Sequence, residues 1–258
     1  TQAKTLFPYT TLFRSVLTRE DGHLNVTRMS ALVDQLAWLR RHDYEVILVS
    51  SGAVMAGRGE LQVDHQLDSV EQRQLFSSVG QGKLIRLYYD LFREYNIKVG
   101  QVLTMKENFL AKEQYQNQKA CMELMLENGV LPIVNENDTV SVEELKFGDN
   151  DILSVHIARL VEADALFILT SVDGLYPPGG RREAIISRVE DVDAVLAFAE
   201  EDQGRFSMGG MSAKLQAIRE AVNAGTGVYM LHGRHPERIA LLLEGREEGA
   251  GTYFVPKG

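Results

Sequence analysis

Three short segments of this sequence carry the glycines and polar side chains that small charged ligands require. In the first, Ser51 and Gly52 follow a run of apolar residues. A glycine lets backbone N–H groups approach an anion closely, and a helix N-terminus favours negative charge. The same two residues are also typical of a helix N-cap serine and a permissive turn, and taken alone they favour that structural interpretation.

The second segment joins residues 135–138 (Asn-Glu-Asn-Asp) to residues 146–151 (Lys-Phe-Gly-Asp-Asn-Asp). Amides and carboxylates can hold the ammonium and carboxylate groups of an amino acid, and Asp151 could also orient a lysine or a metal ion. The competing interpretation is a solvated loop closed by Asp149 or Asn150 as a helix N-cap. We favour a functional loop because it is long and directly follows an apolar run typical of a buried strand.

The third segment, residues 207–214, places a Gly-Gly pair and then Lys214 at the predicted start of a helix. Glycines, a helix N-terminus and a lysine in the first turn suit a polyphosphate. The spacing differs from the Walker pattern, so it predicts no P-loop fold. A flexible loop with Ser212 as the helix cap is the alternative, and a Gly-Gly pair alone is a weak signal.

The elements that must position these segments alternate between two patterns. Apolar runs predict buried strands at residues 45–49, 97–103, 130–134, 165–169 and 228–231. Apolar residues at helical spacing predict helices around residues 26–39, 84–95, 120–126, 152–160 and 215–222. Buried strands separated by amphipathic helices predict an α/β fold, a three-layer αβα sandwich with a mainly parallel central sheet.

The three loops that follow predicted strands are residues 50–52, 135–138 and 170–174, and all are rich in small or polar residues. Ligands of parallel sheets bind beyond the carboxyl ends of the strands. We therefore expect a single binding site at that edge of the sheet. The coincidence of the three loops carries more weight than any one of them.

The composition narrows the class of protein. The chain has 258 residues, of which 45% are apolar, and its formal net charge of −9 argues against nucleic acid or an anionic membrane as a partner. No apolar run reaches the length of a membrane span and no signal peptide is recognisable, so we expect a cytoplasmic protein. Cys121 is the single cysteine, which excludes an intrachain disulfide, and we expect it to be a small core residue. No His/Cys cluster has metal-ligand spacing.

Taken together, the segments resemble the glutamate 5-kinases of the amino acid kinase family. The resemblance extends from about residue 16 to about residue 254, and the asparagine-rich loop is its most specific part. It implies the amino acid kinase (carbamate kinase-like) fold and ATP-dependent phosphorylation of the L-glutamate side-chain carboxylate to L-glutamyl 5-phosphate, the first step of proline biosynthesis. The matching segments are residues 49–53, 79–85, 134–138, 146–151, 173–176 and 209–214.

The resemblance also implies roles for individual residues. Lys214 would neutralise charge on the transferring phosphoryl group, and Asp151 would organise the lysines. The residues expected to bind glutamate are Ser51, Gly52, Asp138 and Asn150. The residues expected to line the nucleotide site are Thr170, Ser171, Met208, Gly209, Gly210, Met211, Ser212, Ala213 and Lys214.

Partners and organisation follow from the same resemblance. It implies ATP and Mg²⁺ as cofactors, L-glutamate as substrate, proline as a feedback inhibitor and a homo-oligomer, with no nucleic acid and no membrane. We expect residues 15–160 to form a glutamate-binding lobe and residues 161–258 a nucleotide-binding lobe. Many relatives continue into a small C-terminal PUA domain, and the sequence here contains no match to it.

The resemblance fails at the N-terminal end. The family's first strand normally ends in a lysine, an apolar residue, a glycine and a small hydroxyl residue, just before the Ser-Val-Leu found here at residues 15–17. Thr11 stands where the lysine belongs and Phe13 where the glycine belongs. Lys4 could replace that lysine only through a shifted strand register. We therefore expect residues 1–14 to be foreign to the family, as a sequencing, assembly or cloning junction would produce; natural divergence is the alternative.

Two smaller departures concern the nucleotide. Ser171 replaces a frequent aspartate, and residues 207–208 replace a more usual Gly-Thr, which we expect to affect nucleotide affinity more than the fold. Two other functions stay open. One is another amino acid kinase, such as an aspartate or N-acetylglutamate kinase, and the other is a catalytically impaired ligand-binding relative.

Overall fold

A computed structural model describes the chain over residues 4–8, 19, 23–64, 66–140, 150–177, 185–201, 209–245 and 249–257. The individually named positions Thr11, Phe13, Asp149 and Met208 lie outside these ranges, as do residues 15–17, 146–148 and 207 of the segments named above. Across the described ranges, no helix combines the length and the apolar character that crossing a bilayer requires.

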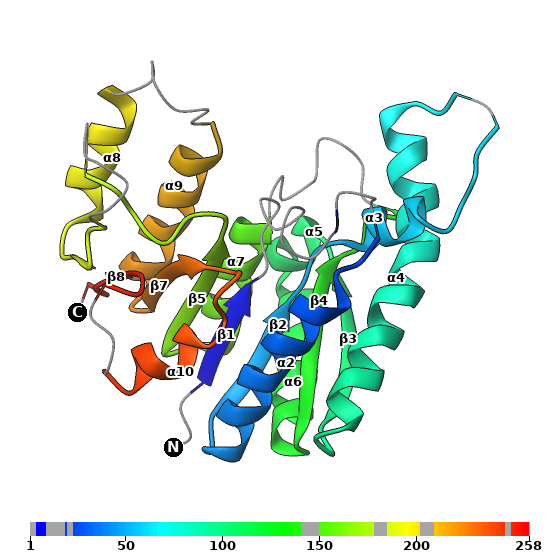
Figure 1. The fold of residues 1–258 in the computed structure, drawn as a ribbon, viewed down its shortest axis with the longest axis horizontal. Helices are drawn as coiled ribbons and strands as arrows, with labels where there is room; N and C mark the ends of the chain where they lie inside the picture. Colours follow the sequence, from blue (N-terminus) through cyan, green and yellow to red (C-terminus); the bar gives the residue numbers. More distant parts are fainter. Residues whose placement is uncertain are drawn as a thin grey trace.

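One sheet of eight strands, in the order β3-β4-β2-β1-β5-β7-β8-β6, organises the described part of the chain (Figure 1). All paired strands are parallel except β7 and β8. The predicted mainly parallel sheet is therefore confirmed. The strands are β1 (Lys4–Pro8), β2 (Glu45–Val49), β3 (Lys98–Thr104), β4 (Val130–Glu136), β5 (Ala165–Thr170), β6 (Arg188–Val189), β7 (Gly227–His232) and β8 (Thr252–Phe254).

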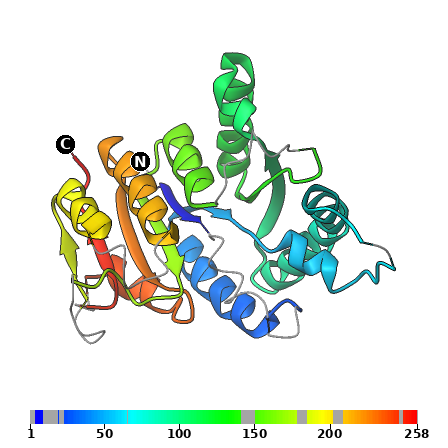
Figure 2. The ribbon, with the colours of Figure 1, turned by 90° about the horizontal axis from the view of Figure 1, so that it is seen from above.

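Helices cover both faces of this sheet. Seen from above, α7 and α9 lie on one side of the strands and α2 on the other (Figure 2). The helices are α2 (Val26–Arg41), α3 (Ala53–Arg58), α4 (Ser69–Arg93), α5 (Lys106–Leu110), α6 (Lys112–Glu127), α7 (Asn150–Val161), α8 (Val192–Glu201), α9 (Gly209–Asn223) and α10 (Arg238–Leu243). The predicted three layers are thus present.

Alternation along the strands divides the core into two layers. In β2, Val46 and Leu48 pack into the cluster that contains α2 and α4, whereas Ile47 and Val49 pack into the cluster that contains α7 and α9. Successive side chains of a strand point to opposite faces, so a strand buried on both faces reads as a continuous apolar run. Each core layer extends across both expected lobes, and the division into lobes stays a prediction.

The five predicted strands are all present, with ends that differ by no more than 2 residues. Helix α4 differs more, because it begins at Ser69. A capping box between Asp68 and Glu71 starts it there. Close packing against α3 then holds its polar first half: a Cβ on Gly80 would lie 1.8 Å from the carbonyl oxygen of Ala53. The short elements α5, α10, β6 and β8, and also α8, were not predicted.

Strand β1 occupies the centre of the sheet, between β2 and β5. Its register pairs Lys4 with Glu45 and Pro8 with Val49. With a rise of about 3.3 Å per residue, the backbone of Lys4 lies roughly 13 Å before the carboxyl end of the strand. This register does not bring Lys4 to the edge where the predicted loops lie, so it offers no replacement for the missing lysine.

Cys121 is exposed, so the prediction that it belongs to the core is wrong. It lies on α6, where Met122 and Leu126 are the buried residues. Helix α6 packs against β4 and α7 through this narrow stripe, and the position next to Met122 faces outward.

Candidate functional site

The carboxyl ends of β2, β4, β5 and β7 meet at one edge of the sheet. Ser50, which follows β2, donates its backbone N–H to the carbonyl of Val134 in β4 (2.8 Å). Gly233, which follows β7, donates its backbone N–H to the carbonyl of Thr170 at the end of β5 (2.8 Å). The loops expected to bind ligands therefore begin from strand ends that are fastened to one another.

Gly52 forms the turn from β2 into α3. Its φ of 104° lies in the left-handed region that favours glycine, and Gly52 itself is the N-cap of α3, without a side-chain hydrogen bond. The interpretation of Ser51 as the helix cap is therefore wrong. Ser51 lies half-buried in the turn, and the preceding Ser50 has its Oγ 2.9 Å from the Tyr88 hydroxyl in the core. That contact anchors the end of β2 to α4.

The asparagine-rich loop begins inside β4 and is held by α4. Asn135 is buried, and its Nδ2 donates to Oε1 of Gln81 (2.8 Å). Asp138, which the resemblance assigns to glutamate binding, has its Oδ1 3.8 Å from Nε of Arg73. The Asp138 and Arg73 side chains are each 17% exposed. Residues 141–149 of this loop are outside the described ranges.

Asp138 has an unusual pKa. Burial, and then the charge of Glu136, raise the pKa of Asp138 from 3.8 to about 6, while the Arg73 guanidinium acts in the opposite direction. The ionised carboxylate is therefore poorly solvated near neutral pH. A further cation, such as an ammonium group of a ligand, would be favoured there because it offsets this penalty.

Helix α7 positions two more of the predicted residues. Asn150 and Asp151 are its first two residues, and both are buried. Asp151 Oδ2 accepts a hydrogen bond from Nζ of Lys214 in α9, and the two side chains form an ion pair with exposures of 2% and 0%. The structure thus brings Asp151 and Lys214 together, as expected for an acid that organises a lysine. Their catalytic roles stay predictions.

Helix α9 begins at Gly209, so Gly209 and Gly210 form its first turn and do not precede it. Lys214 consequently lies in the second turn, one turn later than predicted. Ser212 lies inside the helix and is not its cap. The first backbone N–H groups of a helix have no partner within it, and the helix dipole favours an anion there. The next three residues, Met211, Ser212 and Ala213, are half-buried.

The loop after β5, residues 170–176, is called the β5 loop below. Thr170 is buried, and its hydroxyl accepts a hydrogen bond from the backbone N–H of Val172 (2.9 Å). Its side chain therefore shapes the turn. Ser171 is exposed at the tip of the loop and is the residue of this pair that a ligand could reach from solvent.

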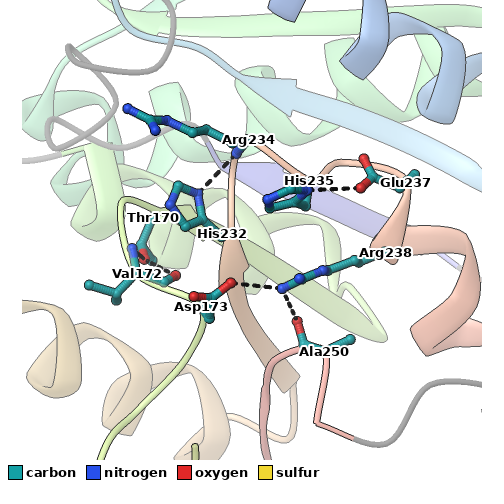
Figure 3. Close-up of polar contacts among 9 residues, drawn as sticks. All are labelled: Thr170, Val172, Asp173, His232, Arg234, His235, Glu237, Arg238 and Ala250. Carbon is teal, nitrogen blue, oxygen red and sulfur yellow. Dashed lines mark hydrogen bonds and ion pairs between the residues drawn. The ribbon is translucent and has the colours of Figure 1, made fainter. Parts of the chain in front are cut away.

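Arg238 is a contributor that the sequence analysis missed. Figure 3 shows its side chain between the β5 loop and the segment that precedes β8. Its Nη1 donates to Oδ1 of Asp173 (2.9 Å) and to the carbonyl of Ala250 (3.3 Å). A single arginine at the start of a short helix carries no signal in the sequence, because Asp173 and Ala250 come together beside it only in the folded chain. Arg73 was missed for the same reason.

His232 ends β7 beside Thr170. Its Nδ1 accepts a hydrogen bond from the backbone N–H of Arg234 (3.1 Å), and burial lowers the pKa of His232 (Figure 3). An accepting Nδ1 and a lowered pKa both indicate a neutral ring whose Nε2 carries the proton.

No group of three or more His, Cys, Asp or Glu residues within the described ranges could hold a metal ion. A Mg²⁺ ion bound to ATP needs few protein ligands, because phosphate oxygens and water supply most of its coordination. The described residues are compatible with such an ion as part of the substrate.

Comparison with known proteins identifies relatives along most of the chain. A model of the amino acid kinase family matches residues 15–232. A curated glutamate 5-kinase of Bacteroides thetaiotaomicron is 49% identical over 94% of this chain and 68% of its own length. The glutamate 5-kinases of Rippkaea orientalis (41%) and Clostridium acetobutylicum (38%) match over 92% and 94% of this chain. The chain spans 65% of the length of the first of these two and 92% of the second.

Solved structures share the fold. A Giardia lamblia carbamate kinase bound to AMP-PNP has a TM-score of 0.65 at 15% identity, over 98% of this chain and 97% of its own. The isopentenyl phosphate kinase of T. acidophilum has a TM-score of 0.62 at 16% identity, over 98% and 100%. At such low identity these structures support the predicted carbamate kinase-like fold alone.

Proposed function

The chain belongs to the amino acid kinase family, and from its likeness to glutamate 5-kinases we propose that it phosphorylates the side-chain carboxylate of L-glutamate. The γ-carboxylate oxygen forms a bond to the γ-phosphorus of ATP, and the bond from that phosphorus to the bridging oxygen of ADP breaks. The products are L-glutamyl 5-phosphate and ADP, and this reaction opens proline biosynthesis. The acceptor is already a carboxylate, so the reaction needs no general base.

The buried pair of Asp151 and Lys214 is the observation that carries the proposal. Asp151 is the second residue of the helix that follows the asparagine-rich loop, and Lys214 lies in the helix assigned to the nucleotide. The pair therefore joins the glutamate side of the site to the nucleotide side. Phosphoryl transfer depends on positioning and on charge compensation, both of which a fixed lysine supplies.

On the glutamate side, Asp138 accepts the α-ammonium group of the substrate, with Ser51, Gly52 and Asn150 completing the site. The pKa of about 6 supports this assignment, because a buried carboxylate near Glu136 gains from a cationic ligand. Arg73 holds Asp138 from the side of α4.

On the nucleotide side, ATP enters with Mg²⁺ and lies between the β5 loop and the start of α9. Ser171 and the backbone of the first turn of α9 face the phosphates. Lys214, held by Asp151, compensates the charge that develops on the transferring group. Met208 belongs to the same proposal from the resemblance, although it lies outside the described residues.

A second copy of this chain is the proposed macromolecular partner. β3 is a margin strand of the sheet, and β3, α5 and α6 follow one another in the chain. Leu103, Leu110 and Leu124 on these three elements are 39%, 76% and 61% exposed. Apolar exposure of this extent supports a homo-oligomer. Proline inhibition and a cytoplasmic location stay predictions from the resemblance.

An ADP-release assay with ATP, Mg²⁺ and glutamate tests the proposal, with aspartate and N-acetylglutamate as control acceptors. We expect turnover with glutamate alone. Faster turnover of either control acceptor would overturn the substrate assignment. The comparisons give those two alternatives no support, since the relatives named above are glutamate 5-kinases.

The same assay tests the N-terminal segment. If residues 1–14 are foreign to the family, Thr11→Lys restores a lysine that stabilises charge in the transition state. Phe13→Gly, made in the same variant, restores a glycine that lets the backbone approach the phosphates. Stabilisers of this kind are worth about 10²–10³ in rate, so we expect a gain of that order. Glutamate binding without turnover in both forms would instead favour a ligand-binding relative. Resequencing the source DNA across residue 15 tests the junction directly, because an unbroken native reading frame contradicts it.

A further inference from the structure

We propose that Arg238 is a positioning residue for nucleotide binding, because it fastens the β5 loop in the conformation that receives ATP. The inference rests on the proposed function and extends it to residues outside the expected nucleotide site. Arg238 is the first residue of α10, and its guanidinium reaches both Asp173 in the β5 loop and the carbonyl of Ala250 (Figure 3). Its side chain is 23% exposed.

A second fastening lies two residues further along the same loop. The backbone N–H of Leu175 donates to Oγ1 of the buried Thr252 (2.7 Å). Gly174 between the two fastenings permits this approach, since a Cβ there would lie 2.7 Å from the same Oγ1. The β5 loop is thus held at two positions. Arg238, which also binds the carbonyl of Ala250, holds Asp173, and Thr252 holds Leu175.

The free part of the loop is the part proposed to meet the nucleotide. Thr170 is fixed at the strand end by Gly233, and Asp173 is fixed by Arg238, so Ser171 lies between two anchored positions. A loop held in its binding conformation loses less conformational entropy when the ligand arrives. Releasing the Asp173 anchor should therefore weaken nucleotide binding while leaving the glutamate side of the site unchanged.

Charge gives Arg238 a second effect in the same direction. Asp173 is a carboxylate two residues from Ser171, on a loop proposed to approach a polyanion. The Arg238 guanidinium neutralises it at 2.9 Å. Without Arg238 the carboxylate would repel phosphate groups. The two effects separate in a double variant, because Asp173→Asn removes the repulsion but does not restore the anchor.

The experiment measures binding of the non-hydrolysable ATP analogue AMP-PNP with Mg²⁺ to the whole chain by calorimetry, and in parallel the binding of glutamate. Four variants are compared with the parent: Arg238→Met, Arg238→Lys, Asp173→Asn and the Arg238→Met/Asp173→Asn pair. Arg219→Met is the control. It removes a surface ion pair between Arg219 in α9 and Asp193 in α8 (2.6 Å), which does not involve the β5 loop.

We expect Arg238→Met to weaken AMP-PNP binding roughly tenfold, in line with the loss of a preorganised loop. Glutamate affinity should change less than twofold. The Arg238→Met/Asp173→Asn pair should recover only the part of this loss that is due to charge repulsion and stay weaker than the parent, because the methionine still cannot hold the loop. Arg238→Lys should recover part of the affinity, and Arg219→Met should match the parent.

Several results would overturn the inference: unchanged AMP-PNP affinity in Arg238→Met, an equal loss for glutamate, or losses that multiply in the double variant. Full recovery by Asp173→Asn in the Arg238→Met background would reject the anchor and leave only the charge effect. If Arg238→Met fails to fold, Arg238→Lys carries the same test, with a smaller loss of AMP-PNP affinity expected. A parent chain that binds no nucleotide would reject the proposed function itself, a result distinct from equal binding in parent and variants.

Discussion

Two ion pairs, one on each side of the proposed site, differ in burial and in geometry. Asp151 and Lys214 are almost wholly buried and in direct hydrogen-bonding contact. Asp138 and Arg73 keep 17% of each side chain exposed, with 3.8 Å between the nearest charged atoms. Loss of one partner from a fully buried pair leaves an uncompensated charge inside the protein, whereas a partly solvated pair at longer range depends less on its partner. The Asp151–Lys214 pair is therefore suited to a fixed contact, and the Asp138–Arg73 pair to a contact that changes when a ligand binds.

Breaking the buried pair should have the largest effect. Asp151→Asn removes the carboxylate that compensates the Lys214 ammonium inside the protein. We expect the free energy of unfolding to fall by about 3–5 kcal/mol and turnover to fall about 10²–10³-fold. Chemical denaturation and the ADP-release assay measure the two effects. The control is Asp193→Asn, on an exposed pair. A stability loss no larger than that of the control would show that the buried pair is not essential.

The response of Asp138 to pH should be the next largest effect. With a pKa of about 6 in the free protein, its ionised form is lost as the pH falls below that value. We therefore expect kcat/KM for glutamate to fall about tenfold per pH unit below pH 6, because the protonated acid cannot pair with an ammonium group. The profile is measured at saturating ATP. A flat profile between pH 5 and 7 would argue against Asp138 as the ammonium acceptor.

Ionisation of Asp138 favours glutamate binding but lowers the stability of the unliganded protein. The folded protein keeps this proton up to about pH 6, whereas an unfolded aspartate loses it near 3.8. Between those two values the folded state binds more protons, so this group by itself lowers the free energy of unfolding as pH rises. The same charge that glutamate binding needs is therefore a cost to the unliganded fold.

Removing the Arg73 guanidinium should produce the smallest of the three effects. Arg73→Met takes away the charge that lowers the pKa of Asp138, so that pKa should rise above 6. The acid limb of the glutamate profile then moves to higher pH, and at pH 7 we expect kcat/KM for glutamate to fall several-fold with little change in the KM for ATP.

Arg73→Lys and Arg86→Met complete this test. The lysine variant retains the charge and should leave the profile near that of the parent. Arg86 lies on the same helix with 86% of its side chain exposed, and its replacement should change nothing. A parent-like profile in Arg73→Met would show that Arg73 supports the loop only by packing.

The predicted fold agreed with the structure where a short-range pattern was sufficient. Residues 46–49 read as a strand buried on both faces because all four side chains are apolar, and with Glu45 they form β2. The first half of α4 was missed because its sequence is polar and its burial comes from contact with α3 through Gly57 and Gly80. Cys121 was misplaced because helical spacing does not reveal how much of a helix the sheet covers.

For the site, the sequence by itself determined which loops follow the strands and which of their residues are polar, because the alternation of strands and helices along the chain follows from local patterns. The resemblance to amino acid kinases further implied that Asp151 organises lysines, among them Lys214. Only the tertiary structure decided that their contact is fully buried and that Arg73 stands beside Asp138. It also decided that Arg238 ties Asp173 to Ala250. The contacts of Lys214 with Asp151 and of Arg238 with Asp173 join residues that are 63 and 65 positions apart along the chain. Their energies depend on burial and distance, which no local sequence pattern contains.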